Sequence, residues 1–181
     1  MDFQLLDLYT LVPEIFLLIG VSAILLLDLF LSEKQRDVTF FFSLIVLVIT
    51  SILPWFFYDV DPRVIMNGLI VSDSLGAALK SFLCLLIAVG LVYSKKYLLS
   101  RGLHRGEYFS LTLFATLGMM VMISSNHFLS LYLGLELLSL SLYAMVALQR
   151  DSGRSSEAAI KYFILGAIAS GMLLYGMSMI Y

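Results

Sequence analysis

The sequence predicts an all-α integral membrane protein with about six transmembrane helices, and two observations carry this prediction. Of the 181 residues, 61% are hydrophobic and only 13% are charged, whereas soluble domains average about 45–50% apolar and about 25% charged residues. The apolar residues also form six runs, each near the ~20 residues that a helix needs to cross about 30 Å of hydrocarbon. These runs span residues about 12–31, 38–57, 73–94, 107–125, 127–148 and 157–181.

Composition also excludes several classes of protein. The formal net charge is −2, and no basic block predicts binding to nucleic acid. The single cysteine, Cys84, lies inside an apolar run, which excludes a disulfide framework or a zinc site within this chain. Residues 1–10 contain two aspartates and no basic residue, unlike a cleavable signal peptide, so we expect the first helix to remain in the mature protein.

Local signals mark the ends of several spans. Pro13 suits the first turn of a helix, where its missing N–H costs nothing. The third span can be capped by Ser72, Asp73 or Ser74, and the sixth by Ser155 or Ser156. Residues 64–71, between the second and third spans, could pair as short strands. The last apolar run continues to Tyr181 without a polar tail, as expected of a fragment or of a final helix that is barely long enough to span.

The distribution of lysine and arginine predicts the orientation. The segments after the first, third and fifth spans carry Lys34, Arg36, Lys95, Lys96, Arg101, Arg105, Arg150 and Arg154. The opposite side carries only Arg63. Because basic loops stay on the cytoplasmic side, we expect both termini to lie outside.

Glu136 is the most informative residue, because it lies near the middle of the fifth span. It is roughly 14 Å from the nearer helix end at ~1.5 Å per residue, and an acid at this depth costs about 2.5–3.5 kcal/mol on insertion scales. Tyr132, Ser139 and Tyr143 share its helix face. The pattern predicts a protonatable functional site with a possible polar path. The alternative is a protonated acid that only holds helices together.

Two lysines within spans are further candidates. Lys80 lies about two turns inside the third span, where reaching back to the nearer interface is the favoured interpretation and membership of the polar path is the alternative. Lys161 follows Glu157 by four residues, so a local ion pair or contact with the interface competes with a role in charge transfer. Glu14 and Asp28, near the two ends of the first span, are interpreted as interface residues.

Three sequence blocks resemble those of subunit N of bacterial proton-pumping NADH-quinone oxidoreductase, respiratory complex I, a family of antiporter-like subunits. The blocks are PEIFLL at residues 13–18, LGLELLSL at residues 133–140 and EAAIKYFILG at residues 157–166. Their order and spacing match the family along the whole chain. The residues around Glu136 distinguish this subunit from the two other antiporter-like subunits of the family.

The resemblance implies an architecture larger than this chain. Family members have about fourteen transmembrane helices, including two inverted five-helix repeats that each contain a broken helix. In that picture residues 1–105 form an N-terminal three-helix segment, and residues 106–181 begin the proton-translocating module. Glu136 corresponds to a glutamate that works with a lysine on the broken seventh helix, and Lys161 to a less central lysine. Those broken helices and their lysines lie beyond the sixth span, so a complete proton path is not expected within these residues.

The resemblance also implies a location and partners. We expect a multi-pass protein of the bacterial inner (plasma) membrane that contacts the lipid bilayer and other membrane subunits of complex I. It would couple quinone reduction to proton translocation without a redox site of its own, since NADH, FMN, iron–sulfur clusters and quinone are expected in partner subunits. Two alternatives are a subunit of a multisubunit cation/proton antiporter and a structural membrane subunit without its own proton path.

Overall fold

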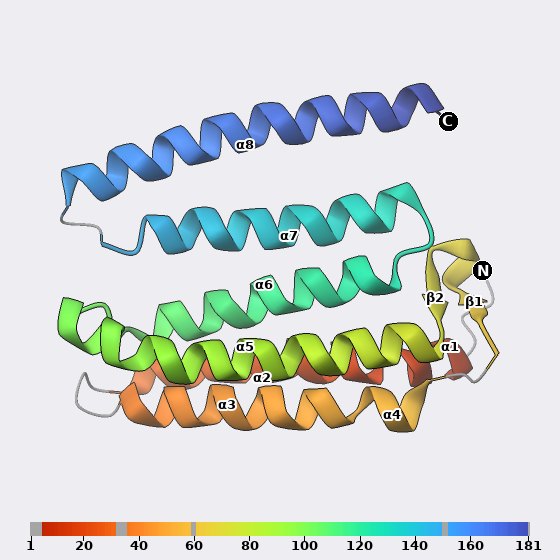
Figure 1. The fold of residues 1–181 in the computed structure, drawn as a ribbon, viewed down its shortest axis with the longest axis horizontal. Helices are drawn as coiled ribbons and strands as arrows, with labels where there is room; N and C mark the ends of the chain where they lie inside the picture. Colours follow the sequence, from red (N-terminus) through yellow and green to blue (C-terminus); the bar gives the residue numbers. More distant parts are fainter. Residues whose placement is uncertain (1–4, 32–35, 59–60, 150–151, 181) are drawn as a thin grey trace.

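The structure is a computed structural model that describes residues 5–31, 36–58, 61–149 and 152–180. Its long helices lie side by side and roughly parallel or antiparallel (Figure 1). In chain order the elements are α1 (Leu5–Thr10), α2 (Val12–Phe30), α3 (Arg36–Ile52), α4 (Pro54–Phe57), β1 (Arg63–Ile65), the 3-10 turn η2 (Met66–Gly68), β2 (Ile70–Ser72), α5 (Ser74–Arg101), α6 (Gly106–Ser124), α7 (Phe128–Val146) and α8 (Gly153–Ile180).

Six of these helical stretches are long and apolar enough to cross a membrane, with α3 and α4 counted as one stretch. The predicted fold class is therefore confirmed. Large apolar side chains also face outward, including Leu29 (79% exposed), Phe30 (86%) and Tyr93 (81%). Such a belt suits contact with lipid rather than water.

Two helix boundaries differ from those predicted. The helix α5 continues to Arg101 and ends at Gly102, which adopts the left-handed conformation with φ = 66°. An apolar run marks only the part of a helix that crosses lipid. The last turns of α5, which contain lysines, lie beyond that part. The helix α8 begins at Gly153. The Ser155 N–H donates to the Ser152 hydroxyl and the Ser155 hydroxyl donates to the Val146 carbonyl, so the expected cap at Ser155 or Ser156 is wrong.

The strands predicted within residues 64–71 are present as a short antiparallel hairpin, with Val64 opposite Val71. Its turn uses left-handed conformations at Met66, Asn67 and Gly68. Asn126 fastens this hairpin to the turn between α6 and α7, donating from its backbone N–H to the Leu69 carbonyl at 2.9 Å and from its side chain to the Gly68 carbonyl at 2.9 Å. Asp73 is the N-cap of α5 and accepts from the Gly76 N–H.

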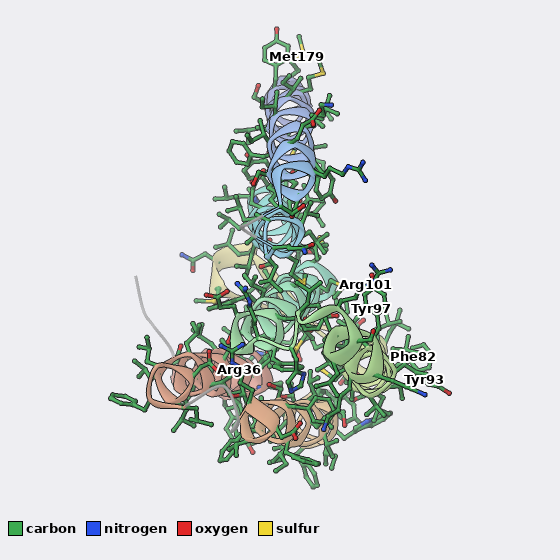
Figure 2. All side chains as sticks on the ribbon, turned by 90° about the vertical axis from the view of Figure 1, so that its left-hand side faces the viewer. Arg36, Phe82, Tyr93, Tyr97, Arg101 and Met179 are labelled. Carbon is green, nitrogen blue, oxygen red and sulfur yellow. The ribbon has the colours of Figure 1, made fainter. Side chains whose placement is uncertain are left out.

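The core lies between α2, α3, α5 and α6. Its fully buried side chains include Leu17, Leu47, Cys84, Phe109 and Met120. Seen along the helices, α7 and α8 extend away from this bundle in single file, with Met179 at the far tip (Figure 2). Half of the apolar window of α6 is buried, compared with 6% for α8. The helix α8 therefore packs mainly against α7.

Two glycines let α6 and α7 approach closely. A Cβ atom on Gly118 would lie 2.7 Å from the Gly134 carbonyl oxygen and 2.8 Å from the Leu138 nitrogen. A Cβ on Gly134 would lie 2.7 Å from the Gly118 carbonyl oxygen. Only the absence of side chains permits this backbone contact. The proposed division of the chain at residues 105 and 106 stays a prediction.

Candidate functional site

Glu136 lies half-buried on α7, on the side that faces α8. The Ser170 hydroxyl of α8 donates to Glu136 Oε1, and the Tyr132 hydroxyl lies 3.0 Å from Ser170 Oγ. Tyr132 and Glu136 are one helical turn apart and therefore share a face. The structure thus brings together two predicted residues, Tyr132 and Glu136, through a third, Ser170, that is not among the predicted site residues. A hydroxyl in the middle of a predicted membrane helix is the sequence feature that could have marked Ser170 as a partner of Glu136.

The other two predicted residues of this face have different surroundings. Tyr143 stacks edge-on against Tyr162 at 4.9 Å and Phe163 at 5.7 Å. Its ring also fills the space beside Gly166, where a Cβ would overlap the tyrosine hydroxyl. Ser139 is half-buried between Glu136 and Tyr143. Tyr143 thus fixes the packing of α7 on α8, seven residues or about 10 Å from Glu136 along the axis.

Lys161 is not brought to Glu136. Its Nζ atom lies 2.5 Å from Glu157 Oε1, and both side chains are well exposed, at 70% and 64%. Lys161 precedes Ser170 by nine residues, or roughly 13 Å along α8. The local ion pair anticipated from the spacing is present, and the functional assignment of Lys161 stays a prediction.

Lys80 and Glu14 require a correction. Lys80 is 8% exposed and Glu14 is 7% exposed, and Lys80 Nζ lies 2.5 Å from Glu14 Oε1. The interpretations of Lys80 as reaching the interface and of Glu14 as an interface residue are therefore wrong. Both residues lie near the start of their helices, α2 and α5, so the opposite charges meet at a similar depth. Their similar depth was a usable signal, but which helices are neighbours is not visible in the local sequence.

Asp28, at the other end of α2, is half-buried rather than lipid-facing. Its carboxylate accepts from the Thr39 hydroxyl at 3.2 Å. The same carboxylate occupies the space beside Gly106, in the first turn of α6. The positive N-terminal end of the α6 dipole favours a negative charge there. Asp28 thus joins α2, α3 and α6 at one end of the bundle.

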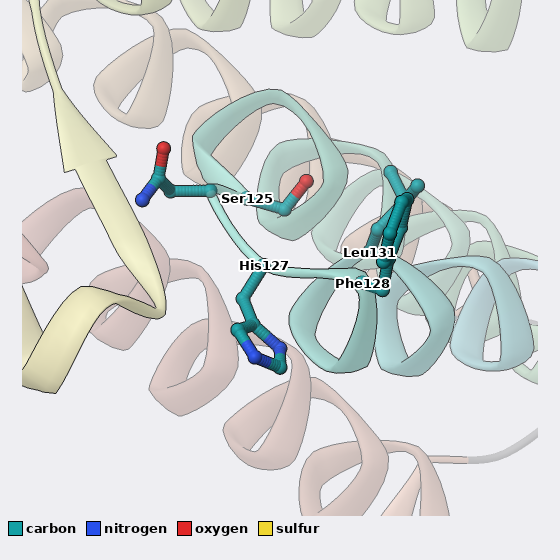
Figure 3. A pocket seen from close by; sticks show the side chains of 5 residues that line it. Ser125, His127, Phe128 and Leu131 are labelled. Carbon is teal, nitrogen blue, oxygen red and sulfur yellow. The ribbon is translucent and has the colours of Figure 1, made fainter. Parts of the chain in front are cut away.

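An open hollow of about 440 Å³ lies at the turn between α6 and α7, lined by Ser125, Asn126, His127, Phe128 and Leu131 (Figure 3). Its polar side chains contribute to local structure. His127 Nδ1 accepts from the Leu129 N–H as the cap of α7, and Asn126 binds the hairpin. Among the described residues no group of three histidine, cysteine, aspartate or glutamate side chains could hold a metal ion.

Comparisons with known sequences agree with this architecture. A family model described as "NADH:quinone oxidoreductase/Mrp antiporter, TM" matches residues 125–181. The chain is 53% identical over all 181 residues to NADH-quinone oxidoreductase subunit N of Nitrosomonas europaea. It is 54% identical over the same length to the subunit N of Thiobacillus denitrificans. In both cases the chain spans 38% of the relative's length, at its N-terminal end.

Solved structures give the same result at the level of the fold. A chain of respiratory complex I from Thermus thermophilus superposes with a TM-score of 0.74 and 26% identity, covering 93% of this chain and 36% of that one. A chain of an archaeal membrane-bound sulfane sulfur reductase superposes with a TM-score of 0.70 at 20% identity, covering 92% and 36%. By sequence along its whole length and by fold, the chain belongs to the family of NADH-quinone oxidoreductase subunit N, whose N-terminal part it matches.

Proposed function

We propose that this chain is the N-terminal part of a membrane subunit of a proton-pumping NADH-quinone oxidoreductase, with Glu136 as its protonatable residue. The main observation behind this proposal is the hydrogen-bonded series of Tyr132, Ser170 and Glu136, which joins α7 to α8. A multi-pass membrane location follows from the six apolar helices. The bacterial inner membrane, an external N-terminus and assembly with other membrane subunits of complex I are parts of the proposal.

The chemistry of the site is proton binding controlled by electrostatics. An ionised Glu136 accepts from Ser170, and Ser170 can in turn accept from Tyr132, because hydroxyl groups both donate and accept. When Glu136 takes up a proton, its O–H can donate to Ser170, and the Ser170 hydrogen can turn to Tyr132. A nearby cation favours the ionised acid, and its withdrawal favours protonation. Such a cation would come from residues beyond the described part of the chain, and redox chemistry belongs to partner subunits.

The rival transport function is a subunit of a cation/proton antiporter. It is favoured by the description of the matching family model, which covers both NADH:quinone oxidoreductase and Mrp antiporter. Glu136 would bind and release protons in either kind of complex. Co-purification of the complete protein with flavin- and iron–sulfur-containing subunits supports the oxidoreductase, and sodium- or potassium-dependent proton exchange without NADH supports the antiporter.

The proposal is tested with Glu136→Gln in the complete protein within the assembled complex. The amide keeps the shape and can still accept from Ser170, so we expect normal assembly. It cannot titrate, so NADH-driven proton pumping should fall by about 100-fold, the lower end of what a positioned proton-transfer group contributes. Glu136→Asp should give intermediate pumping because the acid remains but retreats by one methylene.

Ser141→Ala is the matched control, since Ser141 lies on the same helix but its hydroxyl donates to the Leu137 backbone carbonyl rather than to Glu136. We expect this variant to pump close to the wild-type rate. Wild-type pumping by an assembled Glu136→Gln complex would show that Glu136 has only a structural role. An infrared carboxyl band that does not change during turnover would lead to the same conclusion.

A further inference from the structure

A buried charge pair lies away from Glu136, where α2, α5 and α6 meet. Lys80 Nζ of α5 is 2.5 Å from Glu14 Oε1 of α2. The Ser124 hydroxyl of α6 donates to the same oxygen at 3.1 Å. Ser124 is itself 2% exposed. The proposed function at Glu136 uses none of these three side chains.

Burying this pair is costly. Removing two charges from water costs several kcal/mol per ion even after relaxation, and an apolar pair of similar volume is often as stable or more stable. Glu14 is also incompletely satisfied, because its second oxygen, Oε2, is buried without a hydrogen-bond partner. Both contacts of the carboxylate fall on Oε1. One acceptor atom of Glu14 is therefore available to a proton.

A small cavity connects the lysine end of this pair to the hairpin side of the protein. Its volume is about 10 Å³, close to the minimum that holds one water molecule. Its lining includes Lys80, Thr10, Tyr58 and Asp73, the N-cap of α5. Between Lys80 and Asp73 the lining is formed by Gly76 and Ala77. These small residues leave open space along this face of α5. Lysine side chains on a helix point back toward its N-terminus, so Lys80 points along this space toward Asp73.

We propose that Glu14, Lys80 and Asp73 form a second proton-exchange site, open to the hairpin side of the membrane. Lys80 lines the cavity and contacts Glu14, so it relays the proton. The ammonium gives one proton to the Glu14 carboxylate, forming a carboxylic O–H bond, and its amine takes one from a hydronium ion in the cavity, leaving water. The restored Lys80 ammonium turns from Glu14 toward that water and the Asp73 carboxylate. The reverse movement releases the proton to the same side. The pair thus changes from net zero charge to +1 and back.

Other titratable groups near the pair come from two elements. Cys84, one turn beyond Lys80 on α5, lies close enough to interact electrostatically with Glu14 and Lys80, and Tyr58 follows α4 at the cavity wall. From α6 the described contact is the hydroxyl of Ser124. Asp73 is thus the carboxylate that shares the cavity with Lys80, which makes it the residue to vary.

The test is the infrared difference spectrum between neutral and acidic pH of the complete protein in its assembled complex. We expect a carboxylic acid C=O band on acidification that is absent from Glu14→Gln and retained in Glu136→Gln. Retention in the second variant separates this site from the one proposed above. Asp73→Asn keeps a good N-cap but removes the alternative partner of Lys80. It should therefore lower the midpoint of the band by about one pH unit, a tenfold higher proton concentration.

Two results would overturn the proposal. Identical carboxyl spectra of the wild type and Glu14→Gln would mean that the pair never changes protonation and only joins the helices. A midpoint unchanged in Asp73→Asn would remove the route through the cavity. Should Glu14→Gln fail to assemble, Glu14→Asp keeps the acid, and a shift in its band frequency identifies the residue instead.

Discussion

At the scale of single residues, His104 has the clearest dependence on pH. It lies between α5 and α6, outside the membrane-spanning helices. Burial lowers the pKa of His104 because it disfavours the charged imidazolium, and the cations of Lys95 and Arg36 act in the same direction. The Asp37 carboxylate, 3.5 Å from His104 Nε2, opposes this effect and raises the pKa. The net result is a histidine that the fold prefers to keep neutral.

The sign of the effect on stability follows from linkage. The unfolded chain, with a histidine pKa of about 6.5, binds a proton before the folded chain does as the pH falls. The contribution of His104 to the free energy of unfolding is therefore fully present above about pH 6.5 and declines as the pH falls below it, toward the lowered folded-state pKa. Thermal unfolding midpoints of the wild type should drop with acidity, and those of His104→Gln should drop less. Parallel pH profiles for the two proteins would contradict the prediction.

The charged residues differ in how much of their surroundings the local sequence predicts. Depth along a helix follows from counting, so the sequence predicts Glu136 as an intramembrane acid and offers a local Glu157–Lys161 ion pair as one alternative, which the structure contains. Partners across helices depend on which helices adjoin and how each is rotated. For this reason Ser170 was not recognised as the partner of Glu136, and Glu14 and Lys80 were assigned to the interface instead of to each other.

At the scale of elements, the contact between α6 and α7 predicts a sharp sensitivity to one methyl group. Gly118→Ala would place a Cβ 2.7–2.8 Å from backbone atoms of α7, which cannot rotate away. We expect a loss of about 1–3 kcal/mol in the free energy of unfolding, as for other overpacked sites. Thermal or denaturant unfolding of the purified protein measures this loss.

Gly90→Ala in α5 is the matched control. A Cβ at Gly90 would meet no atom within 4 Å, so the substitution should be neutral or stabilising by up to about 1 kcal/mol through helix propensity. Equal stabilities of the two alanine variants would mean that the two helices separate without cost.

Elements were predicted unevenly because their signals differ in range. Runs of apolar residues predict the six membrane helices, and the segment 64–71 between two spans is predicted as short strands, since both signals are local. The extension of α5 to Arg101 is not predicted, because its last turns contain charged residues and an apolar run no longer marks them as helix. The local sequence does not predict the contact of Gly118 with Gly134, because it depends on which helices adjoin and how each is rotated.

At the scale of the whole molecule, orientation can be tested by chemical labelling. Arg101 and Val64 are exposed at opposite ends of the bundle, at the end of α5 and in the hairpin. In cells producing the complete protein with Cys84 replaced by alanine, a cysteine at position 64 should react with an impermeant thiol reagent added outside. A cysteine at position 101 should react only after the membrane is opened. The reverse pattern would invert the orientation and place the cavity near Lys80 on the cytoplasmic side.

The glycine contact also constrains how this protein can move. Backbone atoms in van der Waals contact leave little room for α6 and α7 to slide or tilt against each other. Glu136 lies on the opposite side of α7 and faces α8, which touches little else in the described part of the chain. A change in the packing of α8 on α7 would therefore alter the surroundings of Glu136 while α6 and α7 stay in contact.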